Sequence, residues 1–243
     1  MKRARAVGWR GFALAAALCN HPLISQTMDK PLVRIAELDV IPAQIENFKA
    51  AGIENITRTL ATEPGVTEFH AVIKRGLPGR VVILEVYADP QAYETHRQAP
   101  HFQRFGSVVA PMVTNKALHD ATPVILGRKL SLSASNPHVR IAEIEIEPSQ
   151  IDAYKAAVTE EIAASIRLEG GVLAIFCVAL KDAPNQLRFL EVYADETAYL
   201  SHREAPHFRK YLEITKPMIR SLKLFEAEPI MLGTRQTPTT LPR

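Results

Sequence analysis

The sequence has little cysteine, and no long apolar stretch follows its first 28 residues. Its 243 residues include two cysteines, Cys19 and Cys177, which excludes an internal disulfide framework. Cys177 stands in an apolar run, so we expect a buried structural thiol there. The lack of long apolar runs predicts no membrane-spanning segment in the mature chain.

Acidic residues are missing before Asp29, whereas four basic residues precede an apolar GFALAAAL run. This layout is typical of a secretory signal, so residues 1–28 are predicted to direct export to the periplasm or the medium. The alternative is a disordered basic tail on a cytoplasmic protein. Without those four residues, 25 basic residues face 26 acidic ones, so nucleic acid is not an expected partner.

The chain contains a tandem duplication. Residues 33–129 align with 139–235 without a gap, and about 39 of the 97 aligned pairs are identical. The longest shared motif is AYETHRQAPHF, residues 92–102, which returns as AYLSHREAPHF 106 positions later. Residues 130–138 are polar and Ser-rich, as in a linker, and 236–243 form a short tail.

Within each copy, the apolar pattern alternates between the period of a strand and that of a helix. The first copy is predicted to have strands at 33–41, 66–74, 80–88 and 114–127, a helix at 42–62, and a Pro-interrupted helical segment after Asp89. This order describes a ferredoxin-like unit with an antiparallel sheet. The helices can cover only one face of that sheet, so the other face needs a partner.

The second copy supplies that partner. We therefore predict an α+β protein of two tandem ferredoxin-like domains, 33–129 and 139–235, whose sheets pair within one chain as a closed barrel. A pocket is expected between each sheet and its own helices, or inside the barrel. Whether the chain also forms a homo-oligomer is left open.

The repeated motif, following an E-x-Y strand end and a capping Asp, resembles the antibiotic biosynthesis monooxygenase domains of the dimeric α+β barrel superfamily. It is similar in particular to small quinol monooxygenases. The resemblance covers both copies and implies oxidation of an electron-rich phenol or quinol by O2 without flavin, haem or metal. The sequence also has no Gly-rich phosphate loop or dinucleotide fingerprint.

His96 and His202 are the predicted catalytic bases, because a histidine at this place on a short helix faces the sheet and can take a proton near neutral pH. The structural alternative is a histidine that binds a carbonyl where the helix ends. Arg97 and Arg203 are predicted to orient the substrate oxygen. Tyr93 and Tyr199 are expected to assist them.

Further candidates for substrate binding are polar or aromatic residues on apolar strand faces or beside the helix break. They are Glu37, Glu143, Tyr87, Tyr193, His101, His207, Phe102 and Phe208. Ion pairing with arginine is the expected role of Glu85 and Glu191. No metal site is predicted, because the five-residue spacing of the histidines around a proline is not a usual ligand arrangement.

The copies also differ, since His70 aligns with Phe176 and His119 with Phe225. Any two pockets are therefore expected to differ in polarity, and one could be silent. Haem-degrading relatives place a Trp near His96 and a haem-binding His about ten residues later. This chain has Gly106 and Leu212 at those later positions, which argues against haem degradation.

The sequence thus favours a cofactor-independent monooxygenase whose partners are a small aromatic or quinone-like substrate and O2. The alternative is a non-catalytic small-molecule-binding or stress-response barrel, in which the repeated His, Pro and Phe only seal the helix junction. Isomerase-like chemistry on a small metabolite is a third reading.

Overall fold

A computed structural model describes residues 31–235, and the predicted leader and tail lie outside this range. The first half consists of β1 (Leu32–Val40), a 3-10 turn (Pro42–Gln44), α1 (Ile45–Thr62), β2 (Val66–Lys74), β3 (Arg80–Tyr87), α2 (Pro90–Gln98), α3 (Pro100–Val109), a 3-10 turn (Ala110–Met112) and β4 (Val113–Arg128). The second half repeats this order as β5 (His138–Ile146), a 3-10 turn (Pro148–Gln150), α4 (Ile151–Leu168), β6 (Val172–Leu180), β7 (Gln186–Tyr193), α5 (Glu196–Glu204), α6 (Pro206–Thr215), a 3-10 turn (Lys216–Met218) and β8 (Ile219–Thr234).

The eight strands form one closed antiparallel barrel in the order β1-β3-β2-β8-β5-β7-β6-β4. The long strands β4 and β8 join the halves. The first part of β4 pairs with β1, and its last part, from Ala121 onward, pairs with β6. β8 pairs in the same way with β5 and then β2. The predicted intrachain α+β barrel is therefore confirmed, and strand sharing leaves neither half with a free sheet edge.

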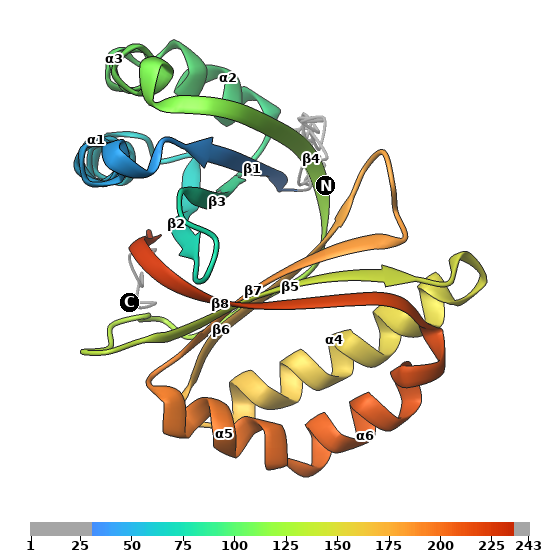
Figure 1. The fold of residues 1–243 in the computed structure, drawn as a ribbon. Coiled ribbons are helices and arrows are strands. Elements are labelled where there is room, and N and C mark those ends of the chain that lie inside the picture. Colours follow the sequence, from blue (N-terminus) through green and yellow to red (C-terminus); the bar gives the residue numbers. More distant parts are fainter. Residues whose placement is uncertain (1–30, 236–243) are drawn as a thin grey trace, which may run out of the picture.

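Strand alternation divides the apolar residues between the barrel interior and the two helix layers. Val33 and Ile35 of β1 point inward, where they share one core with Val139 and Ile141 of β5. Leu38, from the other face of β1, packs in a separate core beneath the helices of its own half. The helices α1–α3 and α4–α6 lie on opposite outer sides of the barrel (Figure 1). No helix within residues 31–235 is long and apolar enough to cross a membrane.

The barrel interior also holds a buried ion cluster. Lys74 is 3% exposed and lies between Glu37, at 3.9 Å, and Glu143, which it contacts directly. Arg188 donates to Glu37 at 3.5 Å. The space that Glu37, Lys74 and Glu143 line together is about 20 Å³, too small for an aromatic molecule. Glu37 and Glu143 therefore bind protein cations here, in contrast to the substrate-binding role expected from the sequence.

His70 and Phe176 meet across the pseudo-twofold axis of the barrel. Their ring centroids are 5.0 Å apart, and both side chains are fully buried. Phe225 packs against the same interior core. These differences between the copies thus change the barrel interior, and the expectation that they set the polarity of two pockets is not met.

Candidate functional site

Three helix ends meet at a cluster of Glu63, His96 and His101, which we call the first-half triad. Glu63 caps the C-terminus of α1, His96 lies in the last turn of α2, and His101 lies in the first turn of α3. Asp89 starts α2 by accepting a hydrogen bond from the Ala92 N–H at 2.7 Å. The Pro100 ring starts α3, and its missing N–H costs nothing at a first helical turn.

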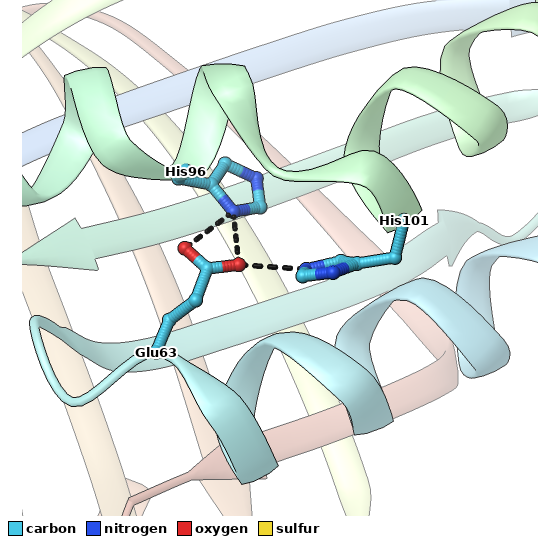
Figure 2. A group of neighbouring side chains, drawn as sticks. All are labelled: Glu63, His96 and His101. Carbon is cyan, nitrogen blue, oxygen red and sulfur yellow. Dashed lines mark hydrogen bonds and ion pairs between the residues drawn. The ribbon is translucent and has the colours of Figure 1, made fainter.

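The carboxylate of Glu63 lies between the two imidazole rings (Figure 2). Its oxygens are 3.0 and 3.1 Å from Nδ1 of His96, and Oε1 is 2.6 Å from Nε2 of His101. Thr59 lies 3.2 Å from the same His101 nitrogen. An N–H from each ring donating to one carboxylate explains these distances and fixes both rings. His96 then presents Nε2, a buried atom without a partner among the described residues.

The second half contains the equivalent triad of Glu169, His202 and His207. Glu169 Oε1 lies 2.9 Å from His202 Nδ1 and 2.7 Å from His207 Nε2. Glu161 on α4 adds a second carboxylate, 3.8 Å from His202 Nε2. Its equivalent in the first half is Asn55. The two sites thus share a frame but differ in charge beside the central histidine.

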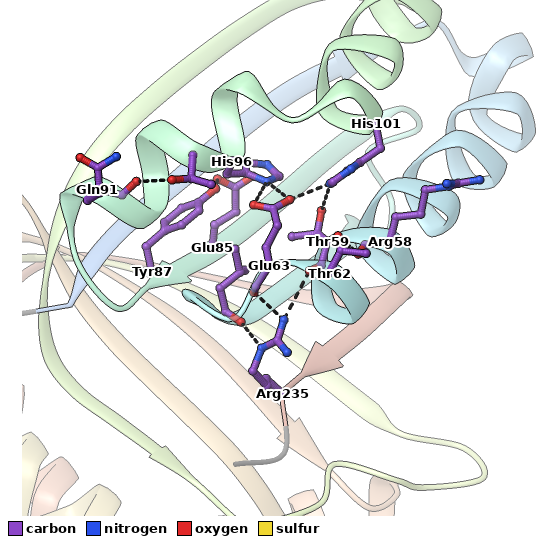
Figure 3. A network of polar contacts seen from close by, with 12 residues as sticks. Arg58, Thr59, Thr62, Glu63, Glu85, Tyr87, Gln91, His96, His101 and Arg235 are labelled. Carbon is purple, nitrogen blue, oxygen red and sulfur yellow. Dashed lines mark hydrogen bonds and ion pairs between the residues drawn. The ribbon is translucent and has the colours of Figure 1, made fainter. Parts of the chain in front are cut away.

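Each triad is tied to the last strand of the other half. Arg235, which follows β8, donates to the backbone carbonyls of Glu63 and, at 3.0 Å, of Val66 (Figure 3). Lys129, which follows β4, donates to the carbonyl of Glu169 at 2.8 Å. Because carbonyls at a helix C-terminus lack partners within the helix, these cations complete both caps.

A cavity of about 570 Å³ opens between the first-half sheet and helix α3. Its walls are largely apolar, with Phe102, Phe105 and Ile83 among them. Arg34, Glu85 and Lys116 are the charged residues at the sheet-side wall. This volume and this mixture of apolar and few charged groups are typical of a small-molecule site.

Glu85 is the carboxyl group that meets the cavity. The Tyr87 hydroxyl donates to Glu85 Oε2 at 2.8 Å. Burial raises the pKa of Glu85, and the charge of His96 and the Tyr87 hydrogen bond offset only part of this rise. Burial, with the nearby Glu85 charge, also raises the pKa of Tyr87 far above its usual range, so its hydroxyl keeps its proton. Glu85 is thus a base stronger than an ordinary carboxylate.

Arg34 provides a positive charge on the strand next to that of Glu85. It pairs with Asp120 across the β1–β4 ladder, and its guanidinium lies 4.9 Å from the centre of the Tyr93 ring. Tyr93 also lines the cavity. The expected ion pair between arginine and Glu85 does not form, because Arg34 pairs with Asp120 instead.

The predicted site residues fall into three places. Tyr93 and Phe102 line the cavity, as a substrate-binding role requires. His96 is fully buried, is not part of the cavity wall and binds Glu63, so the expected direct role as base does not fit. Arg97 is exposed and pairs with Glu94 at 3.2 Å, outside the cavity.

The remaining predicted residues lie in the buried core, in the triads or at the surface. Tyr87 and Tyr193 are fully buried behind the carboxyl groups of Glu85 and Glu191, to which their hydroxyls donate. His101 and His207 belong to the triads. Phe208 packs against His202, with ring centroids 4.4 Å apart. The guanidinium of the exposed Arg203 lies 5.9 Å from the centre of the Tyr199 ring. Tyr199 stacks on His138 with ring centroids 4.8 Å apart.

Larger side chains occupy the positions in the second half that correspond to the cavity wall. The second half has Phe189 at the position of Ile83, Tyr211 at that of Phe105 and Leu212 at that of Gly106. Phe189 and Tyr211 are buried in the second-half core, where the Tyr211 and Tyr154 hydroxyls share a 2.5 Å hydrogen bond. The second half therefore has less room beside Glu191 than the first half has beside Glu85.

Two groups of side chains have ligand atoms within 4.8 Å of one another, close enough to hold a metal ion, and only the first of them is a triad as defined above. These groups are Glu63, His96 and His101, and Glu161, His202 and His207. The sequence spacing of the histidines did not indicate this, since the fold brings in a glutamate from another helix. Hydrogen bonds account for the first group without an ion, as described above.

Two segments, residues 31–107 and 137–214, match the model of the antibiotic biosynthesis monooxygenase family. The chain belongs to this family. A protein named as a monooxygenase from Lactobacillus acidophilus superposes with a TM-score of 0.81 at 22% identity, covering 85% of this chain and 97% of its own. One from Fusobacterium nucleatum gives 0.80 at 21% identity, covering 86% and 96%.

An anthrone oxidase-like protein shares the fold at a TM-score of 0.56 and 12% identity, with 88% of this chain and 98% of its own covered. No curated protein matches the sequence significantly. These structural likenesses show that the tandem-barrel fold is shared. They do not identify a substrate.

Sequence reasoning did not identify the carboxylates Glu63, Glu169 and Glu161, and it assigned Glu85 a purely structural role. A signal for two of them was present, because Glu63 and Glu169 recur at the same 106-residue offset as the histidines. Both stand where a helix ends, so their sequence context indicated only a helix stop.

Proposed function

We propose that the protein is a cofactor-independent monooxygenase that oxidises a small aromatic or quinol-like substrate with O2 in the first-half cavity. The observation that carries this proposal is that a carboxyl group of raised pKa, Glu85, and a cation, Arg34, both line the wall of an apolar cavity of about 570 Å³. Membership of the antibiotic biosynthesis monooxygenase family supports the reaction class.

In this proposal Glu85 takes a proton from a phenolic hydroxyl, and Arg34 stabilises the resulting anion. The anion then gives one electron to O2, and the resulting aryloxyl radical and superoxide combine at a ring carbon to form a peroxide. Cleavage of the O–O bond leaves one oxygen in the product and releases the other as water. One dihydroxyarene and one O2 thus yield one hydroxyquinone and one water, and the substrate supplies all the electrons.

His96 has a positioning role in this scheme. Glu63 and the surrounding rings of Phe69 and Phe102 hold it behind the cavity wall, where its charge acts on Glu85. A non-catalytic barrel remains the alternative function. The observation that favours it is the complete burial of both central histidines in hydrogen-bonded triads.

The test compares Glu85→Gln with its counterpart Glu191→Gln, using a reduced naphthoquinone and measuring oxygen uptake. Glutamine keeps the size and the hydrogen-bond acceptor of the side chain but cannot accept the proton. We expect kcat/KM to fall about 100-fold or more in Glu85→Gln, the usual contribution of a general base. The Glu191→Gln variant is expected to keep the wild-type rate within about threefold, because larger side chains occupy its cavity wall.

Product analysis in 18O2 completes the experiment, with one labelled oxygen expected per hydroxyquinone. Equal losses in the two variants would contradict the assignment of chemistry to the first half. Oxygen uptake no faster than the uncatalysed oxidation, together with saturable naphthoquinone binding, would favour the non-catalytic alternative.

A further inference from the structure

A second cavity in the first half lies between α1 and α3. Its volume is about 380 Å³, and Asn55, His101 and Arg104 supply polar groups to its wall. Phe105 and Met112 contribute apolar surface. The proposed reaction makes no use of this space.

One residue of this cavity wall, Asn55, has a buried side-chain amide without hydrogen-bond partners among the described residues. It is 2% exposed, and neither its amide nitrogen nor its amide oxygen has a hydrogen-bond partner among the described residues. A buried amide without partners is costly and rare. Because Asn55 lies on the wall of the cavity, a hydrogen-bond acceptor inside that cavity can pair with its amide nitrogen.

The second half shows which chemical group belongs at this place. There, Glu161 occupies the position of Asn55, accepts a hydrogen bond from Ser165 at 2.6 Å and lies 3.8 Å from His202 Nε2. The equivalent nitrogen in the first half, Nε2 of His96, has no partner. The first half therefore lacks a carboxylate that the second half carries as part of its own chain.

Among the described residues, the first half has both an unpaired cation and a larger cavity at this place than the second half has. Arg104 forms no ion pair within residues 31–235, whereas its counterpart Lys210 binds Glu160 at 2.8 Å. The cavity on the second-half side measures only about 70 Å³. The neighbouring acid of the first half, Glu54, is paired with Arg58 at 3.5 Å. Arg104 is thus available to an anion from solution.

We infer that the α1–α3 cavity binds a small organic carboxylate. The carboxylate accepts hydrogen bonds from the Asn55 amide and the Arg104 guanidinium, while its apolar part packs on Phe105 and Met112. Arginine is suited to this role because its N–H groups match the two carboxylate oxygens. The ligand brings to the first half a carboxyl group at the place where Glu161 supplies one in the second half.

The inference is tested by NMR titration of the 15N-labelled full chain with sodium benzoate, following the side-chain amide signals of Asn55. We expect saturable shifts with a dissociation constant of roughly millimolar, as for a small ligand with few contacts. Arg104→Glu is expected to weaken binding about tenfold or more, through loss of a charge-assisted hydrogen bond. Lys210→Glu, the matched change in the second half, is expected to leave the constant unchanged.

Asn55→Glu places the second-half carboxylate in the first half and is expected to abolish binding, with folding checked by the backbone spectrum. Because Arg104 is exposed, its variant keeps the test informative if Asn55→Glu does not fold. Benzyl alcohol, the neutral control, is expected to leave the Asn55 signals in place. The inference is overturned if benzoate gives no saturable shift, if the alcohol binds equally well, or if Arg104→Glu binds benzoate like the wild type.

Discussion

Replacing Glu161 with glutamine tests the electrostatics of the second half in a way that needs no substrate. Glu161 is 5% exposed, and burial raises its pKa to about 7, with the charges of Glu191 and Glu169 adding to the rise and the Ser165 hydrogen bond opposing it. His202 also faces this carboxyl group, at 3.8 Å. The group therefore changes its charge near neutral pH.

The size of the effect follows from linkage. The folded-state pKa of about 7 lies roughly 2.5 units above the ordinary value of 4.5, and each unit corresponds to about 1.4 kcal/mol. Since the folded state holds the proton more tightly, this stabilisation is complete below about pH 4.5 and is lost as the pH rises through 7. By pH 8.5 the wild type should have lost about 3 kcal/mol, whereas glutamine, which does not ionise, should lose nothing.

The measurement is urea unfolding followed by circular dichroism at pH 4.5, 6, 7 and 8.5 in both proteins. The free energy of unfolding of Glu161→Gln relative to wild type should rise with pH, most steeply between the unfolded-state pKa of 4.5 and the folded-state pKa of about 7, and should level off above that. Glu160→Gln is the matched control, since this neighbour is exposed and should show no such rise. A difference that stays constant with pH, or a variant less stable than wild type at pH 8.5, would refute the reasoning and indicate that His202 keeps Glu161 ionised.

Two further predictions concern packing and the barrel interior. Gly65→Ala should lower the free energy of unfolding by about 1–3 kcal/mol and lower the melting temperature, because the added Cβ would lie 2.4 Å from Cβ of Ala92 on α2. Gly52→Ala is the control: no atom lies within 4 Å of its added Cβ, so this change should be neutral or slightly stabilising. Lys74→Met should cost about 3 kcal/mol at pH 7 in urea unfolding, because it leaves buried carboxylates unpaired. Adding Glu143→Gln should recover part of this loss, and a double variant no more stable than Lys74→Met would contradict the ion-cluster account.

Most of the fold could be predicted because its determinants are local and occur twice. The alternation in residues 33–41 indicates a strand whose two faces have different neighbours, and Asp89 followed by Pro90 indicates the start of α2. The orientation of His96 toward the sheet was also predictable, and its ring lies 5.8 and 5.7 Å from Phe69 and Tyr87. The partner of His96 was not, because Glu63 lies 33 residues away and only the packed helices bring it close.

The cavity illustrates the other limit of sequence reasoning. Glu85 looked like a member of an ion pair because Arg34 was within reach, but Asp120 on the neighbouring strand takes that arginine. The substitutions that fill the second half, such as Leu212 for Gly106, were visible in the repeat. Their meaning depends on knowing that these positions face the same wall, which the helix-to-sheet packing decides.

The duplication explains why two such different sites persist on one frame. Neither sheet can bury its inner face alone, and each triad depends on a cation from the other half, Arg235 for Glu63 and Lys129 for Glu169. The barrel therefore requires both copies for its stability, while one cavity is enough for one reaction. Because the frame is held from both sides, the second copy can replace Ile83 and Asn55 with Phe189 and Glu161 without loss of the first site. The two halves thus depend on each other for folding, while the side chains of one cavity can change without affecting the other cavity.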